Sequence, residues 1–214
     1  MTFTTSTPTN MSMTSIRSIC VYCGSSDGRG ETYLQAGREL GRSLAENDLR
    51  LVYGGGTKGI MGAVALGTSA AGGKILGIIP RFLIGKETSG PVQIPNLELV
   101  LTEDMHVRKH KMFEESDAFV ALPGGIGTLE EVIEIMTWAQ LGQHSKPIVF
   151  ANIGGFWDPV LALLDHMKQE GFLHSLQRVR PLVVDQADEI VPAILEAAAA
   201  ESPVEGDRQV IDRL

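Results

Sequence analysis

Short apolar runs alternate along this chain with longer segments whose apolar residues recur at helical spacing. Residues 16–22 form the first apolar run, which predicts a strand, and Tyr33, Gly37, Leu40 and Leu44 then follow at the spacing of a helix. Further strands are predicted at residues 49–53, 75–79, 97–101, 118–122, 148–151 and 182–184. Helices are predicted at residues 60–71, 103–116, 129–141 and 187–200. Another helix is predicted to start with Asp158 as its N-cap and Pro159 at its first position.

This alternation predicts an α/β fold: a doubly wound, Rossmann-like parallel sheet with helices on both faces, in a single domain over residues 16–200. Residues 1–15 are rich in Ser, Thr and Met and are expected to form a disordered N-terminal tail. The polar residues 201–214 are expected to form a loose C-terminal tail. The connection at residues 81–96 is long, so we expect it to have a functional role.

The segment from Leu122 to Glu131, LPGGIGTLEE, lies between an apolar run and an amphipathic run. We expect a strand to end here, turn on glycines and lead into a helix. Ligands of open α/β sheets bind at the carboxyl ends of strands. The free N–H groups at the start of a helix attract an anion, and glycines let that anion approach the backbone closely. The sequence therefore predicts an anion site, such as a phosphate site, at this turn.

A second glycine turn, residues 54–59, matches the dinucleotide fingerprint G-x-G-x-x-G between a predicted strand and a predicted helix. That fingerprint requires an acidic residue at the end of the next strand, where this sequence has Ile79, Pro80 and Arg81. A nicotinamide cofactor is therefore disfavoured, although Arg81 leaves a 2′-phosphate variant open. A phosphate cradle without a dinucleotide fits better. The alternative is a turn that serves only helix–sheet packing.

Residues 105–109, Met-His-Val-Arg-Lys, form a basic cluster on a predicted helix. Arg108 offers a planar fork of donors that suits phosphate or carboxylate, although such runs are commonly solvated helix faces. His106 and His110 have the i, i+4 spacing of a zinc helix. Residue 107 is Val where the zinc motif has Glu, and no third ligand is evident, so no metal is predicted.

Glu131 has two interpretations. Thr128 to Glu131 matches a capping box, with Thr128 as N-cap and Glu131 reaching back, and local sequence alone favours this interpretation. The helix is expected to face the core with the stripe Leu129, Val132, Ile133 and Met136. Glu130, Glu131 and Glu134 then lie on the other side, where a carboxylate beside exposed amides and basic residues is expected to stay ionised. Such a carboxylate can stabilise positive charge that develops on a sugar, or orient a water that attacks it.

Composition and charge narrow the class of partner. The net charge of −8 argues against nucleic acid as the main partner. No apolar run reaches the length of a membrane span, and the first residues lack the features of a secretory signal, so a cytoplasmic protein is expected. Cys20 and Cys23 are spaced C-x-x-C within a predicted strand, where they point to opposite faces, and no second pair completes a zinc site. Both are therefore predicted to be buried structural cysteines.

Taken together, these motifs resemble the LONELY GUY family of cytokinin-activating phosphoribohydrolases. That family carries P-G-G-x-G-T-x-x-E, found here at residues 123–131, and M-H-x-R-K, found at residues 105–109. It also carries G-G-G-x-x-G-x-M-G, found at residues 54–62, and T-W-A-Q-L-G, found at residues 137–142. The resemblance extends over about residues 16–172 in matching order and is far more specific than G-x-G-x-x-G alone.

The resemblance implies hydrolysis of the N-glycosidic bond of a nucleoside 5′-monophosphate, without a cofactor, to a free base and ribose 5-phosphate. The implied substrates are N6-isoprenoid adenosine monophosphates and AMP, and the implied assembly is a homodimer. The catalytic pair of the family corresponds to Arg108 and Glu131. With the glycine turns, the resemblance suggests substrate contacts at Ser25, Gly55, Gly56, Thr57, Glu87, Met105, Lys109, Gly124, Gly125, Ile126, Gly127, Thr128, Leu129, Glu130 and Thr137. Ile126 stands where plant members often have Tyr, which leaves the base preference open.

In the expected mechanism, the glycine turn and helix N-terminus hold the 5′-phosphate, and ionised Glu131 lies near the anomeric carbon. Arg108 offsets charge on the departing purine or orients the phosphate and ribose. The competing class is a nucleotide-binding module without catalysis, such as a molybdenum-cofactor carrier, which has no need of the Arg108–Glu131 pair. A third candidate is a nucleotide-sugar or NADP enzyme. Some relatives were labelled lysine decarboxylases, but nothing in this sequence marks a pyridoxal-phosphate lysine.

Overall fold

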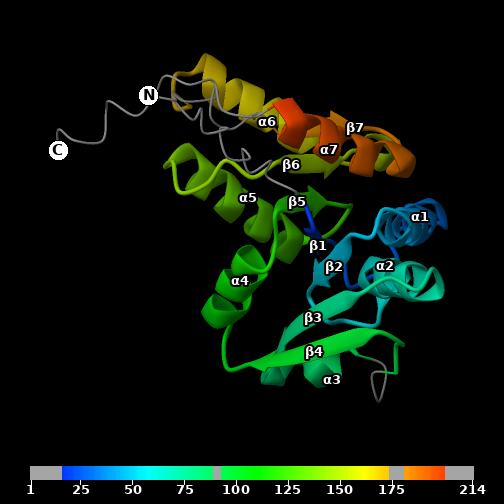
Figure 1. Cartoon of the computed structure of the whole chain (residues 1–214). Helices are drawn as coiled ribbons and strands as arrows, with labels where there is room; N and C mark the ends of the chain where they lie inside the picture. Colours follow the sequence, from blue (N-terminus) through cyan, green and yellow to red (C-terminus); the bar gives the residue numbers. More distant parts are fainter. Residues whose placement is uncertain (1–15, 89–92, 174–180, 201–214) are drawn as a thin grey trace, which may run out of the picture.

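A computed structural model describes residues 16–88, 93–173 and 181–200, so both predicted tails lie outside the described residues. Seven parallel strands form one sheet in the order β4-β3-β2-β1-β5-β6-β7 (Figure 1). The strands are β1 (Ser18–Tyr22), β2 (Arg50–Tyr53), β3 (Ile75–Pro80), β4 (Leu97–Thr102), β5 (Ala118–Ala121), β6 (Ile148–Ala151) and β7 (Leu182–Val184). The predicted doubly wound α/β fold is confirmed.

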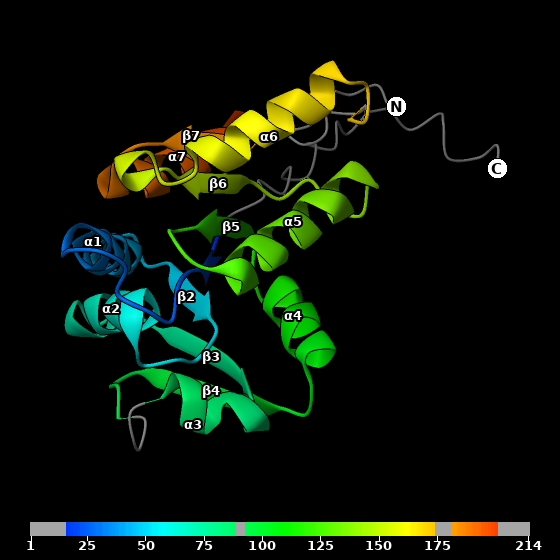
Figure 2. The same cartoon turned by 180° about the vertical axis from the view of Figure 1, so that it is seen from behind.

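Helices cover both faces of this sheet. They are α1 (Thr32–Glu46), α2 (Gly59–Ala70), α3 (Ile84–Glu87), α4 (Met105–Glu114), α5 (Ile126–Gln140), α6 (Asp158–Gln169) and α7 (Ile190–Ala200), with short 3₁₀ turns η1 (Arg81–Leu83), η2 (Ile153–Gly155) and η3 (Ala187–Glu189). Helices α1, α2 and α7 lie on one face, and α4, α5 and α6 lie on the other (Figures 1 and 2). Among the described helices, none is long and apolar enough to cross a membrane.

The alternation of side chains along β1 divides the core into two layers. Ile19 and Val21 belong to the layer under α1, α2 and α7, whereas Cys20 and Tyr22 belong to the layer under α4, α5 and α6. Cys23, directly after the strand, returns to the first layer. Both cysteines are free and buried, as predicted.

One local prediction, the N-cap of α6, was wrong. Asp158 is the first residue of α6 rather than its N-cap, which is Trp157, and Asp158 instead accepts a hydrogen bond of 2.9 Å from the side chain of Asn152. The long connection after β3 contains η1 and α3. Its end is tied to the glycine turn after β2, where the N–H of Thr57 donates to the carbonyl oxygen of Glu87 at 2.9 Å.

The strand order decides where a ligand can bind. The order reverses between β1 and β5, and the helices that follow these two strands, α1 and α5, lie on opposite faces. The chain therefore diverges at the carboxyl ends of β1 and β5 and leaves a crevice between the connections.

Candidate active site

A cavity of about 450 Å³ occupies this crevice. Its walls come from six parts of the chain: residues 21–25 at the end of β1, Gly54 after β2, Met61 of α2, the η1–α3 segment, the inner side of α4, and the start of α5, where residues 125–128, Glu130 and Glu131 line it. The sequence motifs therefore meet in one place, although each was identified separately.

The first turn of α5 forms one wall of the cavity. The helix begins at Ile126 with Gly125 as its N-cap, and no side chain caps it, so the predicted capping box is wrong. Thr128 lies inside the helix and packs so closely over Gly124 that a Cβ on Gly124 would collide with its hydroxyl. The earliest N–H that bonds back to the N-cap carbonyl is that of Leu129, at 3.0 Å. The N–H groups before it have no intrahelical acceptor and are available to an anion.

Arg108 enters the cavity from α4. Asp104 caps this helix by accepting a hydrogen bond of 2.9 Å from the N–H of Val107, and Arg108 and Met112, four residues apart on one face of the helix, are buried. The guanidinium occupies the space beside Gly54, where a Cβ would collide with Nη2. Gly54 therefore leaves room for the guanidinium of Arg108.

Arg108 and Glu131 form a buried ion pair. Nη2 of Arg108 lies 3.8 Å from Oε1 of Glu131, and the two side chains are only 6% and 10% exposed. This distance is too long for a hydrogen bond, so both groups keep bonding capacity for a ligand. On its other side, Nη1 of Arg108 contacts the sulfur of Met105 at 3.7 Å.

Two buried polar atoms of this cavity lack a hydrogen-bond partner among the described residues. They are Nε of Arg108 and Oε2 of Glu87. Buried polar atoms in native proteins are nearly always paired, and an orphan needs a specific explanation. Two orphans in one cavity indicate that a polar ligand completes the site.

Burial changes the acid–base properties of Glu131. Desolvation raises the pKa of its carboxyl from the ordinary 4.5 to about 7, against the opposing effect of the Arg108 charge; Glu130 and Glu87 reinforce the rise. The carboxyl of Glu87 also has a raised pKa, again from burial and again opposed by Arg108. The expectation that Glu131 stays ionised therefore holds only above neutral pH, because the nearby amides and cations do not outweigh desolvation.

Many of the predicted contact residues line the cavity. They are Ser25, Glu87, Met105, Gly125, Ile126, Gly127, Thr128 and Glu130, together with the predicted pair Arg108 and Glu131. Their roles toward a substrate stay predictions.

The glycine turn after β2 contributes less directly than expected, because Gly55, Gly56 and Thr57 do not line the cavity. A Cβ on Gly56 would lie 2.7 Å from the methyl group of Met61 and 3.3 Å from the carbonyl oxygen of Glu87. The turn therefore shapes the wall that carries Glu87, through close backbone contacts that only glycine permits.

Lys109 also lies outside the cavity lining. Its ammonium group contacts Glu130 at 2.6 Å and Glu134 at 3.1 Å, and its side chain is 12% exposed. Lys109 thus joins α4 to α5. This contact stabilises the arrangement in which Arg108 of one helix faces Glu131 of the other.

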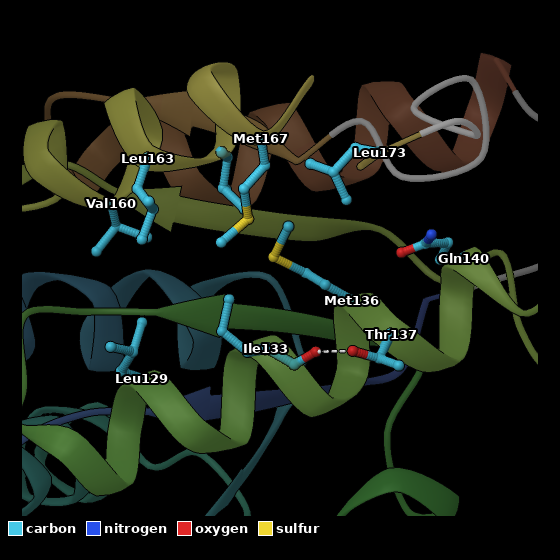
Figure 3. A pocket seen from close by; sticks show the side chains of 10 residues that line it. Leu129, Ile133, Met136, Thr137, Gln140, Val160, Leu163, Met167 and Leu173 are labelled. Carbon is cyan, nitrogen blue, oxygen red and sulfur yellow. Dashed lines mark hydrogen bonds between the residues drawn. The ribbon is translucent and has the colours of Figure 1, made fainter. Parts of the chain in front are cut away.

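Leu129 and Thr137 lie on a different side of α5. They line an apolar groove of about 350 Å³ between α5 and α6, together with Ile133, Met136, Gln140, Val160, Leu163, Leu164, Met167 and Leu173 (Figure 3). The hydroxyl of Thr137 donates to the carbonyl oxygen of Ile133 at 2.7 Å. The predicted apolar stripe is therefore divided: Val132 is buried in the core, Leu129 and Ile133 face this groove, and Met136 is buried but also lines the groove.

Several cavity residues were missed by sequence reasoning. They are Val21, Tyr22, Cys23, Gly24, Gly54, Met61, Phe82, Leu83 and Met112. Gly54 belongs to a motif that was recognised, but its function there depends on the side chain of Arg108. Phe82 and Leu83 lie in the connection for which a functional role was expected, although no motif marks them.

Comparison with known proteins identifies the family. A family model described as "Possible lysine decarboxylase" matches residues 61–194, which include both Arg108 and Glu131. A cytokinin riboside 5′-monophosphate phosphoribohydrolase of Arabidopsis thaliana is 44% identical over 173 residues, which cover 81% of this chain and 75% of the relative. Another from the same plant is 40% identical over 195 residues, covering 91% of this chain and 89% of the relative.

Solved structures agree on the fold. A molybdenum-cofactor carrier protein from Chlamydomonas reinhardtii superposes with a TM-score of 0.62 at 22% identity, covering 87% of this chain and 99% of the carrier. At this identity the likeness concerns the fold alone. The sequence matches are closer and extend over most of the chain. They show that the chain belongs to the LONELY GUY family of cytokinin riboside 5′-monophosphate phosphoribohydrolases.

Proposed function

We propose that this protein hydrolyses the N-glycosidic bond of adenosine 5′-monophosphates, both N6-substituted cytokinin nucleotides and AMP, to a free base and ribose 5-phosphate. Membership of the family supports this reaction. The observation that carries the proposal is the buried pair of Arg108 and Glu131, 3.8 Å apart, beside the uncapped N-terminus of α5. A small nucleotide, rather than a nucleic acid, is the proposed partner.

The 5′-phosphate is assigned to the first turn of α5. The N–H groups of Ile126, Gly127 and Thr128 point out of the helix end, whose partial positive charge favours an anion. Nothing in the described residues lies within 4 Å of a Cβ placed on Gly125 or Gly127, so the backbone is open to close approach. Ser25, at the end of β1, lines the same cavity and offers a hydroxyl.

Glu131 lies about one turn further along α5, where a nucleotide anchored by its phosphate would place its ribose. In its ionised form, the carboxylate supports positive charge that develops at the anomeric carbon and aligns the attacking water. The protonated form cannot provide that negative charge. With a pKa of about 7, both forms are present at neutral pH.

Arg108 has a complementary role. Its guanidinium stays charged, because the pKa of arginine lies above about 12. It is therefore assigned to offset negative charge on the departing purine or to orient the ribose and phosphate, and not to donate a proton. The unpaired Nε of Arg108 provides a donor for that contact.

The alternative is a carrier that binds a nucleotide or cofactor without cleaving it, as the fold of the molybdenum-cofactor carriers allows. A carrier has no need of a buried Arg–Glu pair with a raised carboxyl pKa. Family membership and this pair together favour the hydrolase.

The test is to incubate the purified protein with AMP and with N6-isopentenyl-AMP and to separate free base from nucleotide by chromatography. Glu131→Gln is expected to lower kcat by at least about a hundredfold with the fold intact, because it removes the charge that stabilises the transition state. Glu46→Gln, on the exposed surface of α1, is the matched control and should leave turnover unchanged. Nucleotide binding without release of base would favour the carrier, and an ordinary rate for Glu131→Gln would contradict the proposed role.

We also propose that the protein is a cytoplasmic homodimer whose subunits meet at the groove between α5 and α6. The groove is lined mainly by apolar side chains, and Leu163 and Met167 on its α6 side are substantially exposed (Figure 3). A contiguous exposed apolar surface is typical of an interaction site. Leu163→Glu should convert the dimer to a monomer in sedimentation analysis, and a parent protein that sediments as a monomer would contradict this assembly.

A further inference from the structure

Helices α4 and α5 lie side by side and carry the two members of the Arg108–Glu131 pair (Figures 1 and 2). No hydrogen bond holds these two groups together, since Nη2 of Arg108 and Oε1 of Glu131 are 3.8 Å apart. Their separation therefore depends on the other contacts between the two helices. Phe113 packs edge-to-face on Trp138, with ring centroids 5.0 Å apart, where both helices approach their ends. Closer to the pair, the contacts are ionic.

Lys109 makes these ionic contacts from α4. Its Nζ lies 2.6 Å from Oε1 of Glu130 and 3.1 Å from Oε1 of Glu134. The two carboxylates are four residues apart, so they lie on successive turns of one face of α5, and Glu131 directly follows the first of them. Among the described residues, the ion pairs that join α4 to α5 are these two and the Arg108–Glu131 pair. A single contact resists separation of the helices, whereas contacts on two successive turns also resist sliding of α4 along α5.

Burial distinguishes this contact from an ordinary surface ion pair, which contributes little to a structure. The side chain of Lys109 is only 12% exposed, and that of Glu134 is 25% exposed, against 52% for Glu130. The pair with Glu134 is therefore the better shielded from water and salt. Without the ammonium group, the two carboxylates of α5 would repel each other. Neither Lys109 nor Glu134 lines the cavity, so their contact acts from outside it.

We propose that Lys109 and Glu134 are positioning residues for hydrolysis, whose ion pair holds α4 against α5 so that the guanidinium of Arg108 faces the carboxyl of Glu131. This inference rests on the proposed function and deepens it. It gives Lys109 a role other than the substrate contact that the family resemblance implies. Loss of the ion pair lets the helices shift, and a shift of about 1 Å between reacting groups is enough to lower a rate by up to about a hundredfold. The proposed phosphate site, in the first turn of α5, is retained.

The test measures kcat for AMP and, by calorimetry, the dissociation constant of ribose 5-phosphate, a product that carries the phosphate and is not cleaved. Glu134→Gln should lower kcat about tenfold and change the dissociation constant by less than about twofold, because it moves the reacting groups and not the phosphate site. Lys109→Met should lower kcat by at least as much, and Lys109→Arg, which keeps the charge, should recover most of the loss. The double variant Lys109→Met with Glu134→Gln should be no slower than Lys109→Met alone, because residues that act through one contact have non-additive effects.

Glu114→Gln is the matched control. This glutamate of α4 is 60% exposed, and its ion pair with His110 stays within the helix, so kcat should be unchanged. Thermal melting of each variant checks that the fold is retained. An unchanged kcat for Glu134→Gln, or losses that multiply in the double variant, would refute the positioning role while the proposed hydrolase stands. If Lys109→Met raises the dissociation constant of ribose 5-phosphate by about tenfold or more, the cost of a lost hydrogen bond to a charged group, Lys109 is a substrate contact and the proposal fails.

Crystal structures of the parent and of Glu134→Gln give a readout that does not need turnover. The gap between Nη2 of Arg108 and Oε1 of Glu131 should lengthen by about 1 Å in the variant, the scale of misplacement that impairs catalysis. If the parent releases no base from AMP, the hydrolase is refuted, and this gap then decides the inference. A longer gap supports the positioning role of Glu134, and an unchanged gap refutes it as well.

Discussion

Replacing Glu131 by Gln should stabilise the protein, and the gain should depend on pH. The carboxyl is buried, and its pKa is raised from 4.5 to about 7 mainly by desolvation. A carboxyl with a raised pKa in the folded state binds its proton more tightly there than in the unfolded chain. Its ionisation therefore lowers the free energy of unfolding as pH rises from about 4.5 to above 7, and below 4.5 this effect is absent. Glutamine is neutral at every pH and does not carry this cost.

The size of the effect follows from the pKa. A rise from 4.5 to about 7 corresponds to about 3 kcal/mol once the carboxyl is fully ionised, and the value already includes the attraction of Arg108. For a protein of this size, that difference corresponds to roughly 6 to 12 °C in Tm. The loss or gain of side-chain hydrogen bonds also changes the stability of Glu131→Gln, but by an amount that is nearly independent of pH. The difference between two pH values therefore isolates the ionisation.

The assay is urea denaturation, followed by circular dichroism, of the parent and Glu131→Gln at pH 5 and at pH 8.5. The stability difference between the two proteins should be larger at pH 8.5, in favour of Gln, by about 2 to 3 kcal/mol. Glu46→Gln, whose carboxylate is exposed, should show little change at either pH. An equal difference for Glu131→Gln at both pH values would refute the reasoning that burial raises this pKa.

Three further outcomes are expected. The value of kcat/KM for AMP should fall as the pH is lowered, with an apparent pKa near 7, because protonation removes the charge of Glu131. A fall in kcat/KM with an apparent pKa near 4.5 would argue against a buried base. Gly54→Ala should lower kcat/KM at least about tenfold, since the new Cβ displaces the guanidinium of Arg108, and unchanged kinetics would show that its position is unimportant. Gly41→Ala, at the crossing of α1 and α2, should lower the free energy of unfolding by about 1–3 kcal/mol, because its Cβ collides with the carbonyl oxygen of Val64. An unchanged free energy of unfolding in urea denaturation would contradict that packing.

Periodicity along the sequence was enough to predict the elements and the fold class. The predicted runs at residues 118–122 and 148–151 became β5 and β6, which are entirely buried, because an apolar run of that length must be covered on both faces. The opposite orientation of Cys20 and Cys23 also followed from the two-residue repeat of a strand. The glycine and basic motifs predicted Arg108, Glu131 and the lining residues at the start of α5, because the residue types in each motif indicate its local backbone conformation and charge.

The environment of Glu131 could not be predicted in the same way. Local sequence favoured a capping box, yet Thr128 packs over Gly124 and leaves the helix end uncapped. Likewise, the residues after Gly54 matched a phosphate cradle, yet the turn holds Glu87 through the N–H of Thr57. In the first case the local capping pattern lost to close packing within the turn, and in the second the glycine turn bonds to a segment thirty residues further along the chain.

The sequence by itself thus determined the strands, the helices and the chemical groups available at their ends, because these depend on neighbours within a few residues. Only the tertiary structure decided that Arg108 lies beside Gly54 and that Glu131 is buried 3.8 Å away from Arg108. The physical reason is that desolvation and charge pairing depend on which segments meet in space, and the order of strands in the sheet sets those meetings.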